Sequence, residues 1–369
     1  MEYYEIEDYQ EKKLNKKKLI KTIVIGTSLL IFIVLFAIYV GNAEFRGWID
    51  KYILHKEITE SAGNIITISQ DDNPNIWGYD NNIVILRKNL LEYYNSSGYL
   101  DGNISVNISN PIFKTNGKYL CLAEKDGNKI YLISGKNIVW QKDIEGTISN
   151  VNVNKNGHVS VIVTGTTHKA IVYTYDNVGN PLPTVYLSST HAMDTDISQD
   201  NKQLAIAEIN SAGNVIQSSI RIIDLDIAKE NASEAEIYRY SSDAKDIITS
   251  IKYQNDNVLS CMMDNKIVTI KEKNVKTRVD FEAETTFADI HLDNYFMKIN
   301  KKTTGIFTSE SNVEITNVNN EKLNLYKLEG VPKNITTYND VIGINLGTEV
   351  HFIRNKWMAC KKIYFNKGN

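Results

Sequence analysis

The chain has 369 residues, a formal net charge of −3 and only three cysteines. A nearly neutral balance disfavours nucleic-acid binding, because proteins of that class usually present a strongly basic face. The cysteines Cys121, Cys261 and Cys360 lie far apart in strand-like runs, which excludes a disulfide framework and a metal motif. We interpret them as small core side chains.

An uninterrupted apolar run from Thr22 to Val40 dominates the N-terminal region. As a helix, its nineteen residues would span roughly 28 Å at about 1.5 Å per residue, close to the hydrocarbon thickness of a bilayer. The run therefore predicts a transmembrane helix over 22–40 that contacts the lipid bilayer. The alternatives are a buried core helix, which no other segment is apolar enough to cover, and a cleaved signal peptide ending near 41–43. Signal peptides usually have a shorter apolar region, so we favour the anchor.

Basic residues are concentrated before this run. Lysines stand at positions 12, 13, 16, 17, 18 and 21, whereas the nearest basic residues after the run are Arg46 and Lys51. The positive-inside rule places residues 1–21 in the cytoplasm as a short tail. The C-terminal part is then extracellular, and the protein is a single-pass protein of the cell membrane with a signal anchor.

Residues 41–61 continue the chain beyond the predicted membrane helix. Phe45, Trp48 and Tyr52 recur at helical spacing, so they share one face of a helix. Aromatic residues with a polar edge favour the membrane interface. We expect a juxtamembrane helix or stalk.

From residue 62 to the C-terminus, short runs rich in Ile, Val, Tyr and Thr alternate with Asn, Asp and Gly clusters. Clear examples are KIYLIS (129–134), HVSVIVTG (158–165) and SIRIIDL (219–225). No helical period of useful length interrupts them. This pattern predicts an all-β domain with short strands and frequent turns.

An internal repeat narrows the choice among all-β folds. Four segments share a strand–turn–strand pattern: 110–124, 150–163, 194–208 and 250–263, with weaker copies that begin near Asn75, Thr286 and Asn334. Residues 64–369 divided by seven give about 44 residues per unit, within the period of about 40–45 typical of four-stranded propeller blades. We predict a seven-bladed β-propeller ectodomain over 62–369, with eight blades as the alternative.

The segment ISQDNKQLAIAE (197–208) resembles the turn-and-strand signature of WD-repeat-like and TolB-like propellers, whose usual form is S-P-D-G-K. Gln199 replaces Pro and Asn201 replaces Gly, and Asn tolerates the left-handed conformation that this turn requires. The layout as a whole resembles a family of low-GC Gram-positive single-pass membrane proteins of uncharacterised function with a WD-repeat-like or quinoprotein-like propeller. The resemblance implies the fold and the topology, and no activity.

Alignment of the repeats predicts which residues line the central channel. Alternate residues of a strand point to the same side. On the first strand of each blade, one set of alternate positions is apolar and is expected to pack between blades: Phe113, Val153, Ile197 and Tyr253. The other set of alternate positions faces the channel and gives six candidate ligand-binding residues: Asn150, Asn152, Asp194, Asp196, Ser250 and Lys252. Such a channel would bind a small ligand or only water.

Motifs that carry chemistry are missing from the sequence. It contains no P-loop, dinucleotide-binding, nucleophile-elbow or zincin motif, so we predict no catalytic residue and no cofactor. Asp194, Asp196, Ser198 and Asp200 imitate the start of a calcium loop. The required Gly and Glu are replaced by Gln199 and Ala205, so we predict no metal site.

These features predict a membrane-anchored extracytoplasmic propeller that acts as a binding or scaffolding module at the cell envelope. Its partner would be a protein or another envelope component, and not nucleic acid. The alternative is an extracytoplasmic enzyme that acts on glycan with Asp194 and Asp196 as acid and base, because they are the close carboxylate pair on one predicted face.

Overall fold

The computed structural model describes residues 16–41, 74–95, 98–244, 246–304, 309–338, 341–347, 349–354 and 361–364. The chain divides into two compact units, Met1–Asn64 and Ile65–Asn369, and each is described by itself.

The N-terminal unit contains helix α1 (Lys16–Gly41), which includes the whole of the apolar run from Thr22 to Val40. Large apolar side chains along it are exposed, from 42% for Ile38 to 69% for Phe32. Within the described residues, none of the helices has both the length and the apolar character that crossing a membrane requires. The expected tail before Lys16 and the expected stalk after Gly41 lie outside the described residues.

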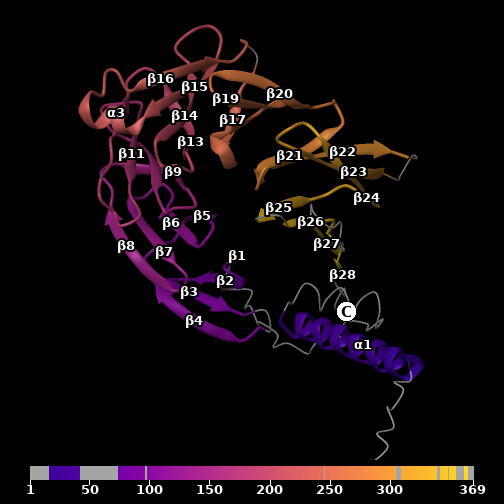
Figure 1. The fold of residues 1–369 in the computed structure, drawn as a ribbon. Coiled ribbons are helices and arrows are strands. Elements are labelled where there is room, and N and C mark those ends of the chain that lie inside the picture. Colours follow the sequence, from indigo (N-terminus) through magenta and orange to yellow (C-terminus); the bar gives the residue numbers. More distant parts are fainter. Residues whose placement is uncertain are drawn as a thin grey trace, which may run out of the picture. The chain divides into compact units, whose positions relative to one another are not determined.

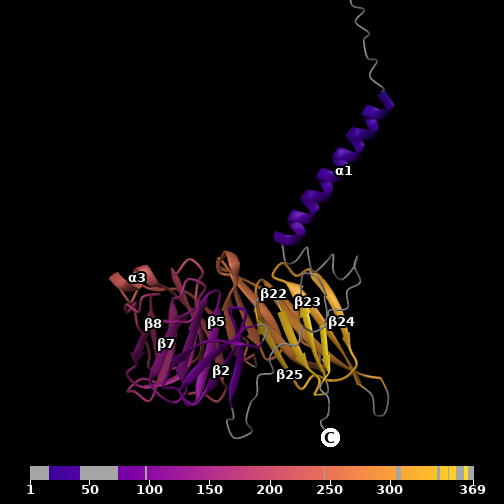
Figure 2. The ribbon, with the colours of Figure 1, turned by 90° about the horizontal axis from the view of Figure 1, so that it is seen from below.

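The C-terminal unit is a seven-bladed β-propeller, as the repeat predicts. Seven four-stranded sheets each consist of four consecutive strands, and neighbouring strands are antiparallel. Figure 1 looks along the axis of the ring, with the first strand of each blade nearest the centre. Figure 2 shows the same strands from the side, running between the two faces of the ring.

The first four blades cover residues 75–241. Blade 1 contains β1 (Asn75–Tyr79), β2 (Asn82–Arg87), β3 (Leu90–Tyr94) and β4 (Leu100–Ser105). Blade 2 contains β5 (Pro111–Asn116), β6 (Tyr119–Glu124), β7 (Lys129–Ser134) and β8 (Asn137–Asp143). Blade 3 contains β9 (Thr147–Val153), β10 (Val159–Thr164), β11 (Ala170–Tyr175) and β12 (Val185–Leu187). Blade 4 contains β13 (His191–Ile197), β14 (Gln203–Asn210), β15 (Gln217–Asp224) and β16 (Glu236–Ser241).

The last three blades complete the ring. Blade 5 contains β17 (Ile248–Tyr253), β18 (Leu259–Met263), β19 (Lys266–Lys271) and β20 (Asn274–Asp280). Blade 6 contains β21 (Thr285–Leu292), β22 (Tyr295–Thr303), β23 (Ser309–Asn317) and β24 (Lys322–Leu328). Blade 7 contains β25 (Asn334–Tyr338), β26 (Val341–Asn345), β27 (Glu349–Arg354) and β28 (Lys361–Tyr364).

Among the described residues of the propeller, two short helices interrupt the all-β pattern. Helix α3 (Leu225–Glu230) connects β15 to β16, and the 3-10 turn η2 (Asn255–Asn257) follows β17. The sequence pattern did not predict α3. The Asp224 side chain caps it by accepting hydrogen bonds from the amides of Asp226 and Ile227, which satisfies donors that a helix start leaves unpaired.

The predicted turns have the expected backbone conformation. Asn201 adopts a φ of 64°, and the equivalent turns use Gly117 at 57° and Gly157 at 83°. These values lie in the left-handed region, where Gly and Asn are tolerated best. The turn prediction for the S-Q-D-N-K segment is therefore confirmed.

The hydrophobic core lies between neighbouring blades. Clusters of buried side chains span each successive pair from blades 1 and 2 to blades 6 and 7. Cys121 and Cys261 are fully buried within these clusters as free thiols, so the prediction of core cysteines is confirmed for both. Cys360 lies outside the described residues.

Blades 7 and 1 meet through the hydroxyl of Tyr338, which accepts a hydrogen bond from the Asp80 amide at 3.1 Å. At the C-terminal end, β28 pairs with β27 and so forms the outer edge of its own blade.

Candidate functional site

The six predicted channel residues lie on three neighbouring innermost strands. Asn150 and Asn152 are on β9, Asp194 and Asp196 on β13, and Ser250 and Lys252 on β17. Because side chains alternate along a strand, the two members of each pair point to the same side of their blade. Their hydrogen bonds show what each side chain does there.

Asp194 joins three blades through four hydrogen bonds. It is only 4% exposed. Its Oδ1 accepts from Asn150 Nδ2 at 3.1 Å and from the Thr195 amide at 3.0 Å. Its Oδ2 accepts from Ser250 Oγ at 3.0 Å and from the Ile251 amide at 2.9 Å. An ionised carboxylate offers only acceptors, so it suits a buried position that four donors surround.

Asp196 repeats this arrangement two residues further along β13, where it is 3% exposed. Its Oδ1 accepts from the Ile197 amide at 2.9 Å, and its Oδ2 accepts from the Tyr253 amide at 2.6 Å. Burial raises the pKa of Asp196 to about 7; the Tyr253 hydrogen bond opposes this shift and the charge of Asp194 adds to it. Asp196 thus links blade 4 to blade 5 while it holds its proton far more readily than an exposed Asp.

The choice between Asn and Asp follows the group that faces each side chain. Asn152 donates from Nδ2 to the Thr195 carbonyl at 2.9 Å, and Asn154 donates to the Ser198 carbonyl at 3.0 Å. Blade 3 therefore presents amide donors to two backbone carbonyl groups and to the Asp194 carboxylate of blade 4. Blade 4 presents carboxyl groups to N–H groups of blade 5. The alternate polar residues on the first strand of each of these repeats therefore serve to hydrogen-bond one blade to the next.

The chain of links continues through blades 6 and 7. Ser250 Oγ lies 3.5 Å from His291 Nε2, and His291 Nδ1 lies 3.2 Å from Asp289 Oδ2. Asp289 Oδ1 also accepts from the His291 amide at 2.7 Å and from Thr337 Oγ1 at 3.1 Å. Burial disfavours ionisation of Asp289, but the His291 and Thr337 contacts outweigh it and lower the carboxyl pKa.

Ser250, His291 and Asp289 stand in the order of a hydrolase triad, in which a serine donates its proton to histidine. A hydroxyl has one proton to donate, and the Ser250 hydroxyl lies closer to Asp194 Oδ2, at 3.0 Å, than to His291 Nε2, at 3.5 Å. The proton is therefore directed away from the imidazole. The three side chains form a bridge between blades, and the serine is not activated as a nucleophile.

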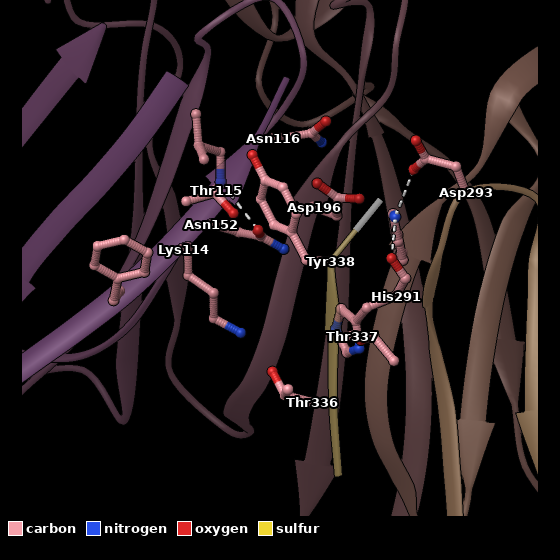
Figure 3. A pocket seen from close by; sticks show the side chains of 13 residues that line it. Lys114, Thr115, Asn116, Asn152, Asp196, His291, Asp293, Thr336, Thr337 and Tyr338 are labelled. Atoms are coloured by element: carbon pink, nitrogen blue, oxygen red, sulfur yellow. Dashed lines mark hydrogen bonds and ion pairs between the residues drawn. The ribbon is translucent and has the colours of Figure 1, made fainter. Parts of the chain in front are cut away.

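A cavity of about 270 Å³ lies in the channel where the innermost strands end (Figure 3). Blades 2 to 7 all contribute to its wall, and three of the predicted residues are among the contributors: Asn152, Asp196 and Lys252. Lys252 Nζ donates to the His291 carbonyl at 2.7 Å and pairs with Asp293 Oδ1 at 3.1 Å. The cavity therefore suits water or a small polar molecule.

The other three predicted residues, Asn150, Asp194 and Ser250, lie two residues earlier on the same strands and are joined to one another. We call the hydrogen-bonded side chains that link neighbouring blades around the channel the inter-blade belt. The structure adds His291, Asp289 and Thr337 to it, which sequence reasoning did not identify. The weak repeats near Thr286 and Asn334 contain all three positions, so alignment of those repeats was the signal that could have found them.

Phe113 packs between blades 1 and 2, as predicted, and also lines the channel cavity. It is partly buried and stacks on Trp77 at a centroid distance of 4.3 Å. The β5–β6 hairpin is tighter than the β13–β14 hairpin, since Asn116 pairs with Tyr119 whereas Ile197 pairs with Leu204. Phe113 therefore lies three residues before the end of β5, whereas Ile197 is the last residue of β13.

Residues 55–361 match DUF5711, described as a family of unknown function, and this range covers most of the chain. No curated protein matches the chain.

Solved structures resemble the propeller at low sequence identity. Apo AztD from Citrobacter koseri has a TM-score of 0.50 and 8% identity, with 84% of this chain and 90% of that chain covered. A prolyl endopeptidase has a TM-score of 0.51 and 10% identity, with 78% of this chain and 49% of that chain covered. BamB from Moraxella catarrhalis has a TM-score of 0.45 and 11% identity, with 82% and 91% covered. Likeness at this level concerns the fold alone.

Proposed function

We propose that this chain, which belongs to the family of unknown function DUF5711, is a binding or scaffolding module held at the cell envelope by its N-terminal helix. In this proposal the helix anchors the protein in the membrane. The propeller lies outside the cell and carries the binding surface for a protein or another envelope component.

The sequence of α1 supports the anchor. The run from Thr22 to Val40 contains no charged residue, and six lysines precede it. Apolar side chains from Val24 to Ile38 are exposed on all sides of the helix. A helix that is apolar all round needs either a protein core or lipid around it, and the basic flank favours lipid with the N-terminus inside.

The belt of inter-blade hydrogen bonds is the observation that carries the binding role. Asp194 alone joins blades 3, 4 and 5, and Asp289 joins blades 6 and 7. These polar groups are occupied by the fold itself. The ring is thereby held as a rigid platform, and rigid platforms bind partners with little loss of conformational entropy.

The same bonds do not favour the alternative of a glycan-cleaving enzyme. Such an enzyme needs one carboxyl group to protonate the leaving oxygen and a second to act as base or nucleophile. In Asp194 and Asp196, all four carboxyl oxygens accept backbone amides or side-chain donors. Both carboxylates are held by the fold, and of the two only Asp196 lines the channel cavity, so the pair is not presented together to a substrate.

Site-specific photo-crosslinking of the full-length protein in its own host membrane tests the proposal. A photoreactive residue would replace Asp256 or Lys125, which lie on opposite faces of the ring, or Val139 on outer strand β8. A binding module should give a discrete adduct at one of these positions and not at the others. Identical adduct patterns at every position, or none at any, would contradict a specific partner.

A further inference from the structure

A second cavity, of about 560 Å³, lies away from the channel on one face of the ring. It is formed by turns of blades 3, 5 and 6, with Lys155, Lys271, Arg278 and Asn294 among its lining residues. We call it the basic groove. The first and third connections of an antiparallel four-stranded blade lie on the same face, and the groove is built mainly from such connections.

Three cations line the basic groove, against one acidic side chain, Asp256. Lys155 and Lys271 are exposed, and neither forms an ion pair with any described residue. Arg278 donates from Nε to Thr269 Oγ1 at 2.7 Å, which fixes its guanidinium and leaves the remaining N–H donors for another group. The groove thus carries an excess positive charge in a chain whose net charge is −3.

The remaining lining is polar. Asn255, Asn294 and Asn319 supply amide groups, and Val258 and Val318 are the apolar members of the lining. The groove therefore offers no aromatic platform and little apolar surface, so it suits a hydrophilic ligand. Its volume is within the range of about 300–1,000 Å³ typical of ligand sites and exceeds what a single inorganic ion fills.

The walls of the groove are held in place without a ligand. The Asn255 amide donates to Asn294 Oδ1 at 3.1 Å, and the Asn294 amide donates to Gln254 Oε1 at 2.8 Å. Gln254 Nε2 in turn donates to the Ile290 carbonyl at 2.9 Å. These bonds join blade 5 to blade 6 through Asn255 and Asn294, which both line the groove. A pre-formed site of this kind loses little entropy when it binds.

We propose that the basic groove binds a hydrophilic polyanion that carries several phosphate groups. Lysine acts as a point charge toward phosphate, and arginine adds paired N–H donors, so this set of side chains matches phosphate better than it matches an apolar peptide. The inference rests on the proposed binding function and names the chemistry of one partner. It does not depend on the channel cavity.

The test uses the purified full-length protein in neutral detergent micelles, titrated with inorganic polyphosphate by isothermal calorimetry. The variant Lys155→Gln/Lys271→Gln removes two exposed groove cations. The matched control Lys125→Gln/Lys301→Gln removes the same charge from two exposed positions toward the opposite face, one in the β6–β7 turn and one near the end of β22. Both pairs lie on the surface, so both variants are expected to fold, and equal melting temperatures would verify this.

The groove variant should bind polyphosphate at least about tenfold more weakly, the size expected when charge-assisted hydrogen bonds are lost. The control should stay within about twofold, because distant exposed charges are screened at physiological salt. Poly-glutamate should bind more weakly than polyphosphate to the unaltered protein. Equal losses in the two variants, equal binding of the two polymers, or no polyphosphate binding would overturn the proposal, even if crosslinking identifies a protein partner elsewhere.

Discussion

Replacement of Asp194 by Asn tests whether the channel carboxylates hold the ring together. The change keeps the shape of the side chain but replaces one acceptor oxygen with an NH₂ donor. That donor must face either the Thr195 amide or the Ile251 amide, which lie 3.0 and 2.9 Å from the two carboxylate oxygens. One buried N–H group then loses its acceptor in either orientation.

An unpaired buried amide costs about 1–3 kcal/mol, and loss of the charge weakens the remaining bonds, so we expect a total of about 2–4 kcal/mol. The melting temperature should fall by roughly 3–6 °C for a domain of about 300 residues. Chemical denaturation of the full-length protein, followed by tryptophan fluorescence to which Trp77 and Trp140 of the propeller contribute, measures the free energy of unfolding.

The matched control is Asp143→Asn, because Asp143 is 68% exposed on its side chain and pairs with Lys129 only at 3.5 Å. It should change the free energy of unfolding by less than about 0.5 kcal/mol. If Asp194→Asn is as stable as this control, Asp194 is not a structural link, and its carboxylate is available for a ligand or for chemistry.

Three further changes test other parts of the account. Tyr338→Phe removes the acceptor of the Asp80 amide between blades 7 and 1 and should cost about 0.5–1.5 kcal/mol in a thermal melt, whereas exposed Tyr99→Phe should cost nothing measurable; equal melts would show that this bond does not help close the ring. Burial holds the pKa of Asp196 at about 7, above its ordinary 3.8, so the folded state keeps a proton that the unfolded state releases. The stability from this proton is complete below pH 4 and is lost as the pH rises through 7; Asp196→Asn should flatten that part of the curve of unfolding free energy against pH, and an unchanged slope would contradict the assignment. Residues 62–369 made as a soluble protein should show β-type circular dichroism and one cooperative melt, because about 300 residues bury a sufficient core; a helix-dominated spectrum would contradict the propeller.

The repeat in the sequence was sufficient to predict the ring. The weak copies near Asn75 and Asn334 begin where β1 and β25 begin, and the copy near Thr286 is one residue from the start of β21. Hairpins with a fixed turn chemistry and alternating strands leave local signals of this kind. The number of blades follows from the number of these repeats.

The predicted channel positions lie on the innermost strands, but their role was not readable from the sequence. The alternation along a strand indicates to which side a side chain points. It does not indicate the hydrogen-bond partner on the next blade, because that partner is distant in the sequence. The Ile251 amide that faces Asp194, and the Tyr253 amide that faces Asp196, are each 57 positions away. The basic groove was missed for the same reason, since Lys155 and Lys271 line one cavity only when blades 3 and 5 are in place.

The most direct test of the proposed location and role is cysteine accessibility in intact host cells. Cys121 and Cys261 are fully buried, so a chain with Cys360→Ser provides an unlabelled background. In that background, Lys125→Cys on the propeller should react with a membrane-impermeant maleimide, and Asn15→Cys should react only after the cells are permeabilised. Labelling of position 15 but not of position 125 in intact cells would contradict an extracytoplasmic binding module anchored by its N-terminal helix.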